Sequence, residues 1–278
     1  MSVPGSIGLT ALDPVGRAEL VRWLGDSPFT ALTNGQLAQG LCRAYAVGEL
    51  RSPRIAVVRP AAEPAEPIAF GTDVEALWTI LSRLPGWTCV NVDPAISSRV
   101  VSLLERTTRG RARIVNERYY VLEEAPRPVA TDRVRRLGPS DDELVGRSGP
   151  LFAPFFVGHG STARTLVEGV VAGAIQNGEL VSAVTTSAWT GGHVDLGAAT
   201  LPAWRGLGLA TSAAHLVATG LRSAGRRPVW AAGESNRASW RIPEKLGFRF
   251  VGRREYVVLE GVEAGGFRPA GTASAPEL

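Results

Sequence analysis

The sequence predicts a mixed α/β fold in two parts, and three observations carry this prediction. The chain has 278 residues, more than one domain of about 100–200 residues usually needs. A segment rich in proline and charge, residues 123–140, has the composition of a linker. The pattern that follows is β-hairpin, β, α, β, α, β, which is typical of a mixed sheet flanked by helices. We expect an upstream α/β domain at 1–130, a second domain at 131–261 and a flexible tail at 262–278.

The elements of the second part follow from local signals. Two β-prone runs flank Asn177-Gly178, a dipeptide preferred in tight hairpin turns because both residues adopt positive φ. A strand over 193–201 should end at Pro202, which has no N–H for a ladder. Next we expect a helix at 211–223, a strand at 228–232, a helix at 236–246 capped by Gly247, and a last strand at 248–259.

The upstream part has a similar pattern. We expect strands at 68–72, 88–92 and 113–122, with helices at 75–84 and 95–106. The segment RIVNERYYV at 113–121 aligns without a gap with RFVGRREYV at 249–257. Because chance matches between β-rich segments are common, a duplicated fold and a coincidence both stay open.

Composition excludes several classes of protein. No apolar run reaches the roughly 18 residues needed to cross a bilayer, and the first residues lack the blocks of a secretory signal. We therefore expect a cytoplasmic protein with no membrane partner. Two cysteines outside any CxxC pair and three scattered histidines predict neither a disulfide framework nor a metal site. The net charge of +4 is spread over the chain, so no nucleic-acid partner is expected.

The segment RGLGLA at 205–210 connects a predicted strand to a predicted helix. The first N–H groups of a helix have no partner inside it, and glycines let a phosphate approach them closely. A dinucleotide-binding fingerprint requires the motif GxGxxG, and a P-loop requires GxxxxGK[ST]; this segment matches neither motif. A diphosphate site and a plain strand–helix turn remain the alternatives.

This loop resembles the R/Q-x-x-G-x-G/A signature of the GCN5-related N-acetyltransferases (GNAT), with Arg205, Gly208 and Ala210 at the matching positions. The segment NRASWRIPEKLGF at 236–248 resembles a second signature of that superfamily, N-x-x-A/S-x-x-x-Y-x-K-x-G-F. It matches at Asn236, Ser239, Lys245, Gly247 and Phe248. The resemblance covers residues 133–259 and is closest to two-part bacterial members. It implies a splayed central sheet flanked by helices, preceded by a smaller half that would be a degenerate copy.

The resemblance also implies a function, the transfer of an acetyl group from acetyl-CoA to a primary amine of a small molecule or protein. The amine would attack the thioester directly, through a tetrahedral intermediate whose oxyanion a backbone N–H near Ala199 could stabilise. Strands 194–201 and 228–232 would splay apart to bind pantetheine. The implied cofactor-binding residues are Ala199, Thr200, Leu201, Arg205, Gly206, Leu207, Gly208, Leu209, Ala210, Thr211, Asn236 and Ser239.

The attacking amine must lose a proton, so the reaction needs a base. Asp195 and His193 share one face of a predicted strand, and Asp195 is the first choice. Alternatively, Asp195 is an ordinary carboxylate at the edge of the sheet, and His193 is a solvated residue of the preceding turn.

The chain departs from the family pattern at Pro243, where the superfamily usually has the tyrosine that protonates the leaving thiolate. Either the thiolate leaves unassisted, which a thiol pKa of about 8–9 tolerates, or another group serves. A third alternative is a non-catalytic acyl-CoA-binding or sensing module.

The acceptor side has no motif. Phe152, Phe155, Phe156 and His159 could wall an amine pocket or pack in the core. The upstream half has no R-x-x-G-x-G/A loop, so we expect it not to bind CoA. It would complete the acceptor cleft or form the surface of a homodimer.

Overall fold

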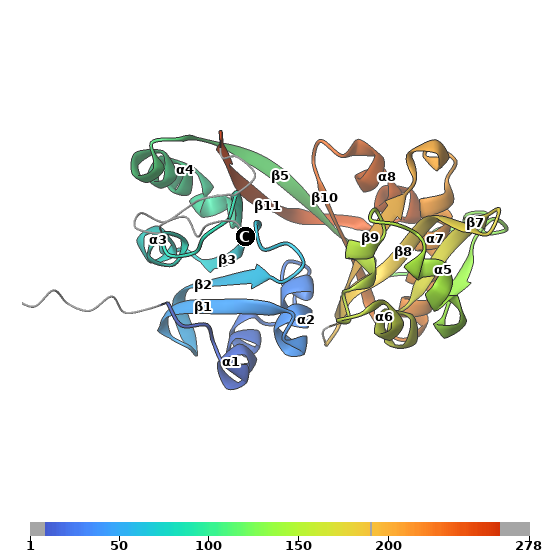
Figure 1. The fold of residues 1–278 in the computed structure, drawn as a ribbon, viewed down its shortest axis with the longest axis horizontal. Helices are drawn as coiled ribbons and strands as arrows, with labels where there is room; N and C mark the ends of the chain where they lie inside the picture. The colour runs from blue at the N-terminus through green and yellow to red at the C-terminus, as the bar shows by residue number, and fades with distance from the viewer. Residues whose placement is uncertain (1–8, 190, 262–278) are drawn as a thin grey trace, which may run out of the picture. The chain divides into compact units, whose positions relative to one another are not determined.

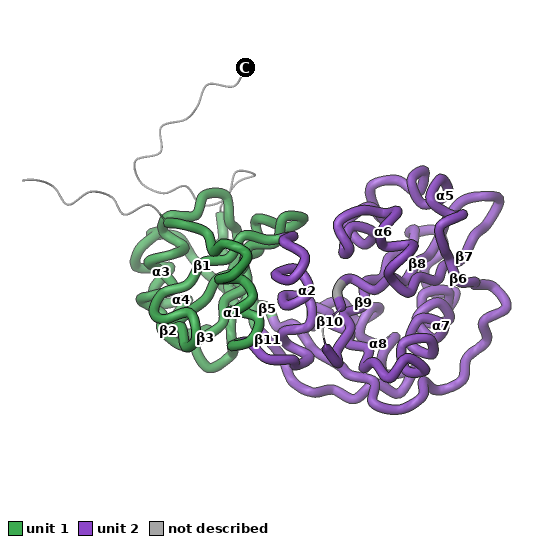
Figure 2. Tube along the Cα trace, turned by 90° about the horizontal axis from the view of Figure 1, so that it is seen from below, with its two compact units in different colours: residues 1–23, 42–115, 255–278 green, residues 24–41, 116–254 purple. Residues whose placement is uncertain are grey.

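The computed structural model describes residues 9–189 and 191–261. The chain forms two compact units, and neither lies wholly on one side of residue 130 (Figure 2). The first unit consists of the residues up to Trp23, of Cys42–Val115 and of the residues from Glu255. The second consists of Leu24–Leu41 and Asn116–Arg254. The physical reason is that two long strands pass from one unit into the other.

The first unit holds strands in the order β1-β2-β3-β4-β11. Figure 1 labels β1, β2, β3 and β11 of this set. Its elements are α1 (Pro14–Leu24), β1 (Cys42–Glu49), β2 (Ser52–Pro60), β3 (Ile68–Gly71), α3 (Val74–Leu81), β4 (Cys89–Val92), α4 (Pro94–Thr108), the start of β5 (Arg111–Val121) and the end of β11 (Arg249–Glu260). Its core includes Leu77, Ile80, Trp87 and Val100, all fully buried. The predicted strands and helices between 68 and 122 are therefore confirmed, each with its ends shifted by a few residues.

The second unit holds strands in the order β5-β10-β9-β8-β7-β6. Its elements are α2 (Ala31–Gln39), β6 (Arg135–Leu137), η1 (Pro139–Asp141), α5 (Asp142–Gly146), η2 (Ala153–Phe156), α6 (Thr162–Glu168), β7 (Val171–Gln176), β8 (Glu179–Trp189), β9 (His193–Thr200), η3 (Pro202–Trp204), α7 (Leu209–Ser223), β10 (Arg227–Gly233) and α8 (Arg237–Leu246). The hairpin between β7 and β8 turns at Asn177 and Gly178, whose φ values are 51° and 80°, as predicted.

The parallel strands β9 and β10 separate partway along their length. They pair only from His193 to Asp195 on β9 and from Arg227 to Val229 on β10. Beyond that point β9 continues to Thr200 and β10 to Gly233. The predicted splay is therefore confirmed, and it begins directly after Asp195.

The two faces of this sheet are covered differently. On one face Ala213, Val217 and Leu221 of α7 pack in one cluster with Val194 and Trp230. The other face carries α2 and η2: α2 packs on β8 and β9, and Ala31 contacts Val121 and Val229. None of the described helices is long and apolar enough to span a membrane.

The first half of the chain repeats the order of the second. Each has a hairpin, a strand, a helix, a parallel strand, a helix and a long last strand, which is β5 in the first half and β11 in the second. The last strands are exchanged: β5 pairs antiparallel with β10, and β11 pairs antiparallel with β4. The similar segments at 113–121 and 249–257 are these two strands, so their similarity reflects a duplicated fold.

Candidate functional site

A cleft of about 490 Å³ lies where β9 and β10 separate, between the β9–α7 loop and α8. Ten of the twelve predicted cofactor-binding residues line it; Leu201 and Leu207 do not. Leu207 is half exposed on the loop, and Leu201 packs against the cluster around Phe152. The loop and the start of α8 thus meet in space as the two sequence signatures require.

The N-terminus of α7 is shaped to receive an anion. Gly206 and Gly208 have φ values of 78° and 80°, a region that side chains other than glycine rarely adopt. No heavy atom lies within 4 Å of where a Cβ would stand on either residue. Gly208 is the N-cap of α7, and no side chain caps the helix. The first N–H groups of α7 are therefore left for a ligand, where the helix dipole favours negative charge.

Three cations line the same cleft: Arg205, Arg241 and Lys245. The Nε of Arg205 donates to the carbonyl oxygen of Thr200 at 3.2 Å, which ties the loop to the end of β9. Arg241 and Lys245 are one turn apart on α8. Sequence reasoning missed Arg241 because no signature contains it, although its spacing from Lys245 places both on one helix face. This set of donors fits a ligand with several phosphates.

The α8 wall of the cleft begins with two linked polar residues. Asn236 caps the helix, its Oδ1 accepting from the N–H of Ser239 at 3.2 Å. The Oγ of Ser239 lies 3.1 Å from Nε1 of Trp230, which donates to it. Pro243 is buried inside α8. Because proline has no N–H and no polar side chain, this residue cannot donate a proton to a leaving group.

Asp195 has the chemistry of a base at neutral pH. It is 8% exposed and is the last residue of β9 that pairs with β10. Burial, and then the negative charge of Glu117, raise its pKa to about 7, against a hydrogen bond from Ser187 that lowers it. Ser187 is the extra residue of a bulge in β8, opposite Asp195. Asp195 is not part of the cleft lining.

Phe155 connects this carboxylate to the cleft. It lines the cleft, and a Cβ on Gly197 would stand 2.7 Å from its ring and 2.9 Å from Oγ of Ser187. The ring of Phe155 and the hydroxyl of Ser187 therefore lie together over Gly197, two residues after Asp195. Only a glycine leaves room for both.

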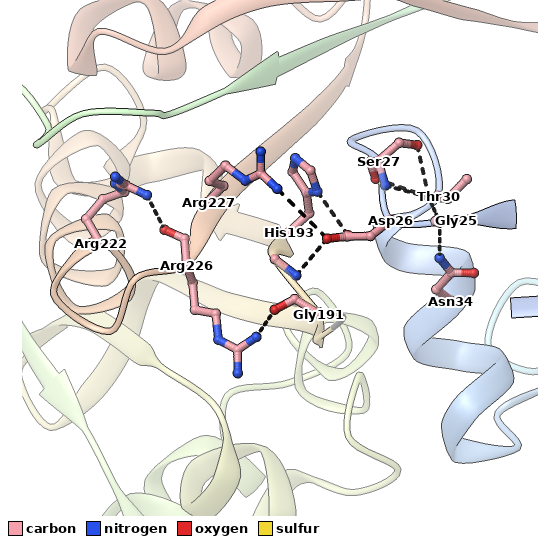
Figure 3. Close-up of polar contacts among 11 residues, drawn as sticks. Gly25, Asp26, Ser27, Thr30, Asn34, Gly191, His193, Arg222, Arg226 and Arg227 are labelled. Carbon is pink, nitrogen blue, oxygen red and sulfur yellow. Dashed lines mark hydrogen bonds and ion pairs between the residues drawn. The ribbon is translucent and has the colours of Figure 1, made fainter. Parts of the chain in front are cut away.

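His193 does not line the cleft, and its ring contacts Asp26 instead. Its Nδ1 lies 2.9 Å from Oδ1 of Asp26, whose Oδ2 accepts from the N–H of Gly192 at 2.7 Å (Figure 3). Arg227 completes the cluster, 3.9 Å from the same Oδ2. Asp26 thus fastens the segment that leads into α2 to the start of β9.

The comparisons with known proteins agree with this geometry. A family model described as GNAT acetyltransferase matches residues 158–259. This match takes in most of the residues that line the cleft. The sequence matches none of the curated proteins with which it was compared.

Solved structures share the fold over most of the chain. A GCN5-related N-acetyltransferase-like protein from Streptococcus suis 89/1591 is 18% identical, with a TM-score of 0.62 over 88% of this chain and 99% of its own. A GCN5-related N-acetyltransferase from Kribbella flavida is 13% identical, with a TM-score of 0.54 over 92% and 97%. A tandem GNAT protein from the clavulanic acid biosynthesis pathway is 14% identical, with a TM-score of 0.53 over 91% and 98%. The splayed sheet is therefore a GNAT fold, and the upstream half resembles a further GNAT-like part.

The aromatic segment before α6 of the GNAT domain divides between cleft and core. Phe155 lines the cleft, whereas Phe152 and Phe156 are fully buried. His159 is also buried, between Thr186 at 3.4 Å and Glu168 at 3.8 Å. Burial is the largest cause that lowers its pKa. Of the four residues considered for an amine pocket, only Phe155 is placed to serve in one.

The GNAT-like first unit has a cleft of about 560 Å³ at the equivalent place, between the start of α3 and one face of α4. Its β3–α3 connection is short, and Asp73 caps α3 by accepting from the N–H of Ala76 at 2.9 Å. The other oxygen of Asp73 pairs with Arg54 at 2.9 Å. The N-terminus of α3 is therefore capped by a side chain, unlike that of α7.

Proposed function

We propose that this protein transfers an acetyl group from acetyl-CoA to a primary amine of a small molecule or protein. The observation that carries the proposal is the cleft at the splay, where an uncapped glycine-rich helix N-terminus is combined with three cations. The family match at residues 158–259 supports acyl transfer in general.

The residues of the cleft fit acetyl-CoA part by part. The N–H groups of residues 206–210 would hold the pyrophosphate, and Arg205, Arg241 and Lys245 would neutralise its phosphates. The edge of β9 that β10 does not pair with, beyond Asp195, would hold the amides of pantetheine. When bound, acetyl-CoA supplies a thioester carbonyl that an amine can attack.

Asp195 would act as the base. A carboxylate with a pKa of about 7 is substantially ionised at neutral pH and still basic enough to take a proton from an amine. We prefer it to His193, because the Nδ1 of that ring is bound to Asp26. Pro243 donates nothing, so the thiolate would leave without a proton from α8, as its pKa of about 8–9 allows.

A second function is favoured by one observation, the buried proline at position 243. Without an acid for the leaving group, the domain would bind acyl-CoA as a sensor and not turn it over.

Two measurements on the purified protein separate the proposals. Calorimetric titration with acetyl-CoA should show micromolar binding, and thiol release should then respond to members of a primary-amine panel. Binding without thiol release from any amine would favour the sensor. Absence of binding at millimolar acetyl-CoA would overturn both.

A further inference from the structure

The start of α8 forms one wall of the cleft, although little of it is buried. Asn236, Ala238 and Ser239 line the cleft there. The buried residues of α8 are Pro243 and Leu246, which belong to its second half. Pro243 has no N–H to donate to the carbonyl oxygen of Ser239, and a helix of ten residues depends on tertiary contacts for its stability. The contacts made by the first half of α8 therefore decide how well this wall is ordered.

The strand β5, from the upstream half of the chain, supplies such contacts through three alternate residues. Asn116, Arg118 and Tyr120 project from one face of the strand. The Nδ2 of Asn116 donates to Oε2 of Glu234 at 2.7 Å, and its carbonyl oxygen accepts from the N–H of Glu234 at 2.8 Å. The hydroxyl of Tyr120 donates to Oε1 of Glu244 at 3.3 Å. Asn116 thus holds the turn before α8, and Tyr120 holds its second half.

Arg118 contacts α8 between these two points. The centre of its guanidinium lies 4.7 Å from the ring centre of Trp240, within the range of a cation–π interaction. The rings of Phe250 and Tyr120 lie 5.1 and 5.5 Å from the same guanidinium. The Nε1 of Trp240 also donates to the carbonyl oxygen of Glu234 at 3.0 Å. The three rings therefore keep the guanidinium in one place, and the guanidinium in turn holds Trp240.

Trp240 connects this stack to the cleft. It stands between Ser239 and Arg241 in the sequence, and both of these residues line the cleft. Any displacement of Trp240 therefore moves the hydroxyl of Ser239 and the guanidinium of Arg241 together. Trp240 itself is not part of the lining. Its substitution removes no direct contact with a ligand, which allows positioning to be separated from binding.

We propose that Arg118 is a positioning residue for acetyl-CoA, because its stack with Trp240 orders the α8 wall of the cleft. This inference rests on the proposed acetyl-CoA site. It gives the upstream half of the chain a part in cofactor binding, although the lining contains no described residue before Leu151. Arg118 then acts on the affinity for acetyl-CoA and not on the chemical step.

The test is a double-mutant cycle on the full chain, read by calorimetric titration with acetyl-CoA. Arg118→Met removes the charge and keeps an unbranched apolar side chain, whereas Trp240→Leu removes the ring and changes no charge. Arg113→Met is the matched control, since it removes an exposed arginine of the same strand, whose partner is Glu260. Val145→Ala, at a buried position of α5 outside the lining, controls for a general loss of stability.

We expect Arg118→Met and Trp240→Leu each to weaken acetyl-CoA binding by about fivefold or more. The double variant should bind within about twofold of the weaker single variant, because all three lack the same contact. Arg113→Met and Val145→Ala should change the dissociation constant by less than about twofold. Arg118→Lys, which keeps the cation, should bind within about twofold of the wild type. With any acceptor that is acetylated, Arg118→Met should raise KM for acetyl-CoA by the same factor and leave kcat unchanged.

Equal affinity in Arg118→Met and Arg113→Met would overturn the inference. Losses that multiply in the double variant would also overturn it, because Arg118 and Trp240 would then act separately.

A second readout does not need acetyl-CoA. Amide hydrogen exchange in residues 236–242 should be faster in Arg118→Met than in the wild type and unchanged in Arg113→Met. If exchange differs in this way but the wild type does not bind acetyl-CoA, the proposed function fails and the ordering of α8 by Arg118 stands. If the wild type binds acetyl-CoA but exchange in Arg118→Met is unchanged, the positioning role is refuted and the proposed function stands.

Discussion

Gly208→Glu places a carboxylate where the pyrophosphate of acetyl-CoA is proposed to lie. Gly208 has a φ of 80°, so a side chain there strains the backbone by about 1 kcal/mol. No heavy atom lies within 4 Å of the new Cβ, so the change creates no clash. The fold should therefore persist, and the effect on binding should be electrostatic.

The size of the effect follows from the geometry of the helix N-terminus. A glutamate at the N-cap would lie about 5 Å from a diphosphate held by the first N–H groups. At that distance and an effective dielectric constant of about 40, each pair of like charges costs about 1.7 kcal/mol. Two phosphate charges give about 3 kcal/mol, which weakens acetyl-CoA binding about 100-fold.

Calorimetric titration measures this directly, with Gly225→Glu as the matched control. Gly225 follows α7 at its other end, with a φ of 70° and nothing within 4 Å of its Cβ position. Both variants carry the same strain and charge, and only Gly208→Glu should lose affinity. Wild-type affinity in Gly208→Glu, or an equal loss in Gly225→Glu, would refute the assignment of the loop.

Three further predictions concern charged groups of the second unit. Asp195→Asn should reduce thiol release about 100-fold and should remove the acid limb near pH 7 from the pH–rate profile. Because burial raises the folded-state pKa of Asp195, its ionised carboxylate costs stability as pH rises from about 4 to 7. The variant should therefore be more thermally stable than the wild type at pH 8 but not at pH 4. Asp26→Ala leaves buried His193 and a backbone N–H without their acceptor and should cost about 2–3 kcal/mol in urea unfolding; no change would show that this cluster does not hold α2. Asp141→Asn breaks the fork of Arg135, at 2.6 and 2.9 Å, and should cost about 1 kcal/mol at pH 7. Because Arg135 lowers the pKa of Asp141, this difference should shrink as pH falls below about 4 and Asp141 becomes protonated in the folded state, and a constant difference would contradict the reasoning.

Local signals in the sequence were sufficient where one short segment determines the structure. Asn177 and Gly178 adopt the positive φ values that their turn requires, and Gly247 ends α8 at a φ of 89°. The loop at 205–210 was singled out by its glycines between a strand and a helix, and Asn236 by the resemblance to a GNAT signature; the structure brings both to one cleft. In each case the physical cause lies within a few residues of the effect.

Long-range pairing could not be predicted in the same way. The segments at 113–121 and 249–257 have the same alternation, so nothing in either pattern tells which penultimate strand it joins. For this reason Glu117 was not recognised as a residue whose charge acts on Asp195. Asp26, the partner of His193, lies 167 residues away in a region where no element was predicted.

The exchange of β5 and β11 makes the two halves of the gene product mutually dependent. A fragment ending near residue 125 would contain β5 without β10, and the remaining fragment would contain β11 without β4. Each fragment would be left with a long strand and an open sheet edge, which favour aggregation. When both fragments are present, the first supplies β5 for β10 of the second, and the second supplies β11 for β4 of the first, so they should associate one to one. The chain is therefore suited to split-protein reconstitution, in which acetyl-CoA binding would report that the two pieces have met.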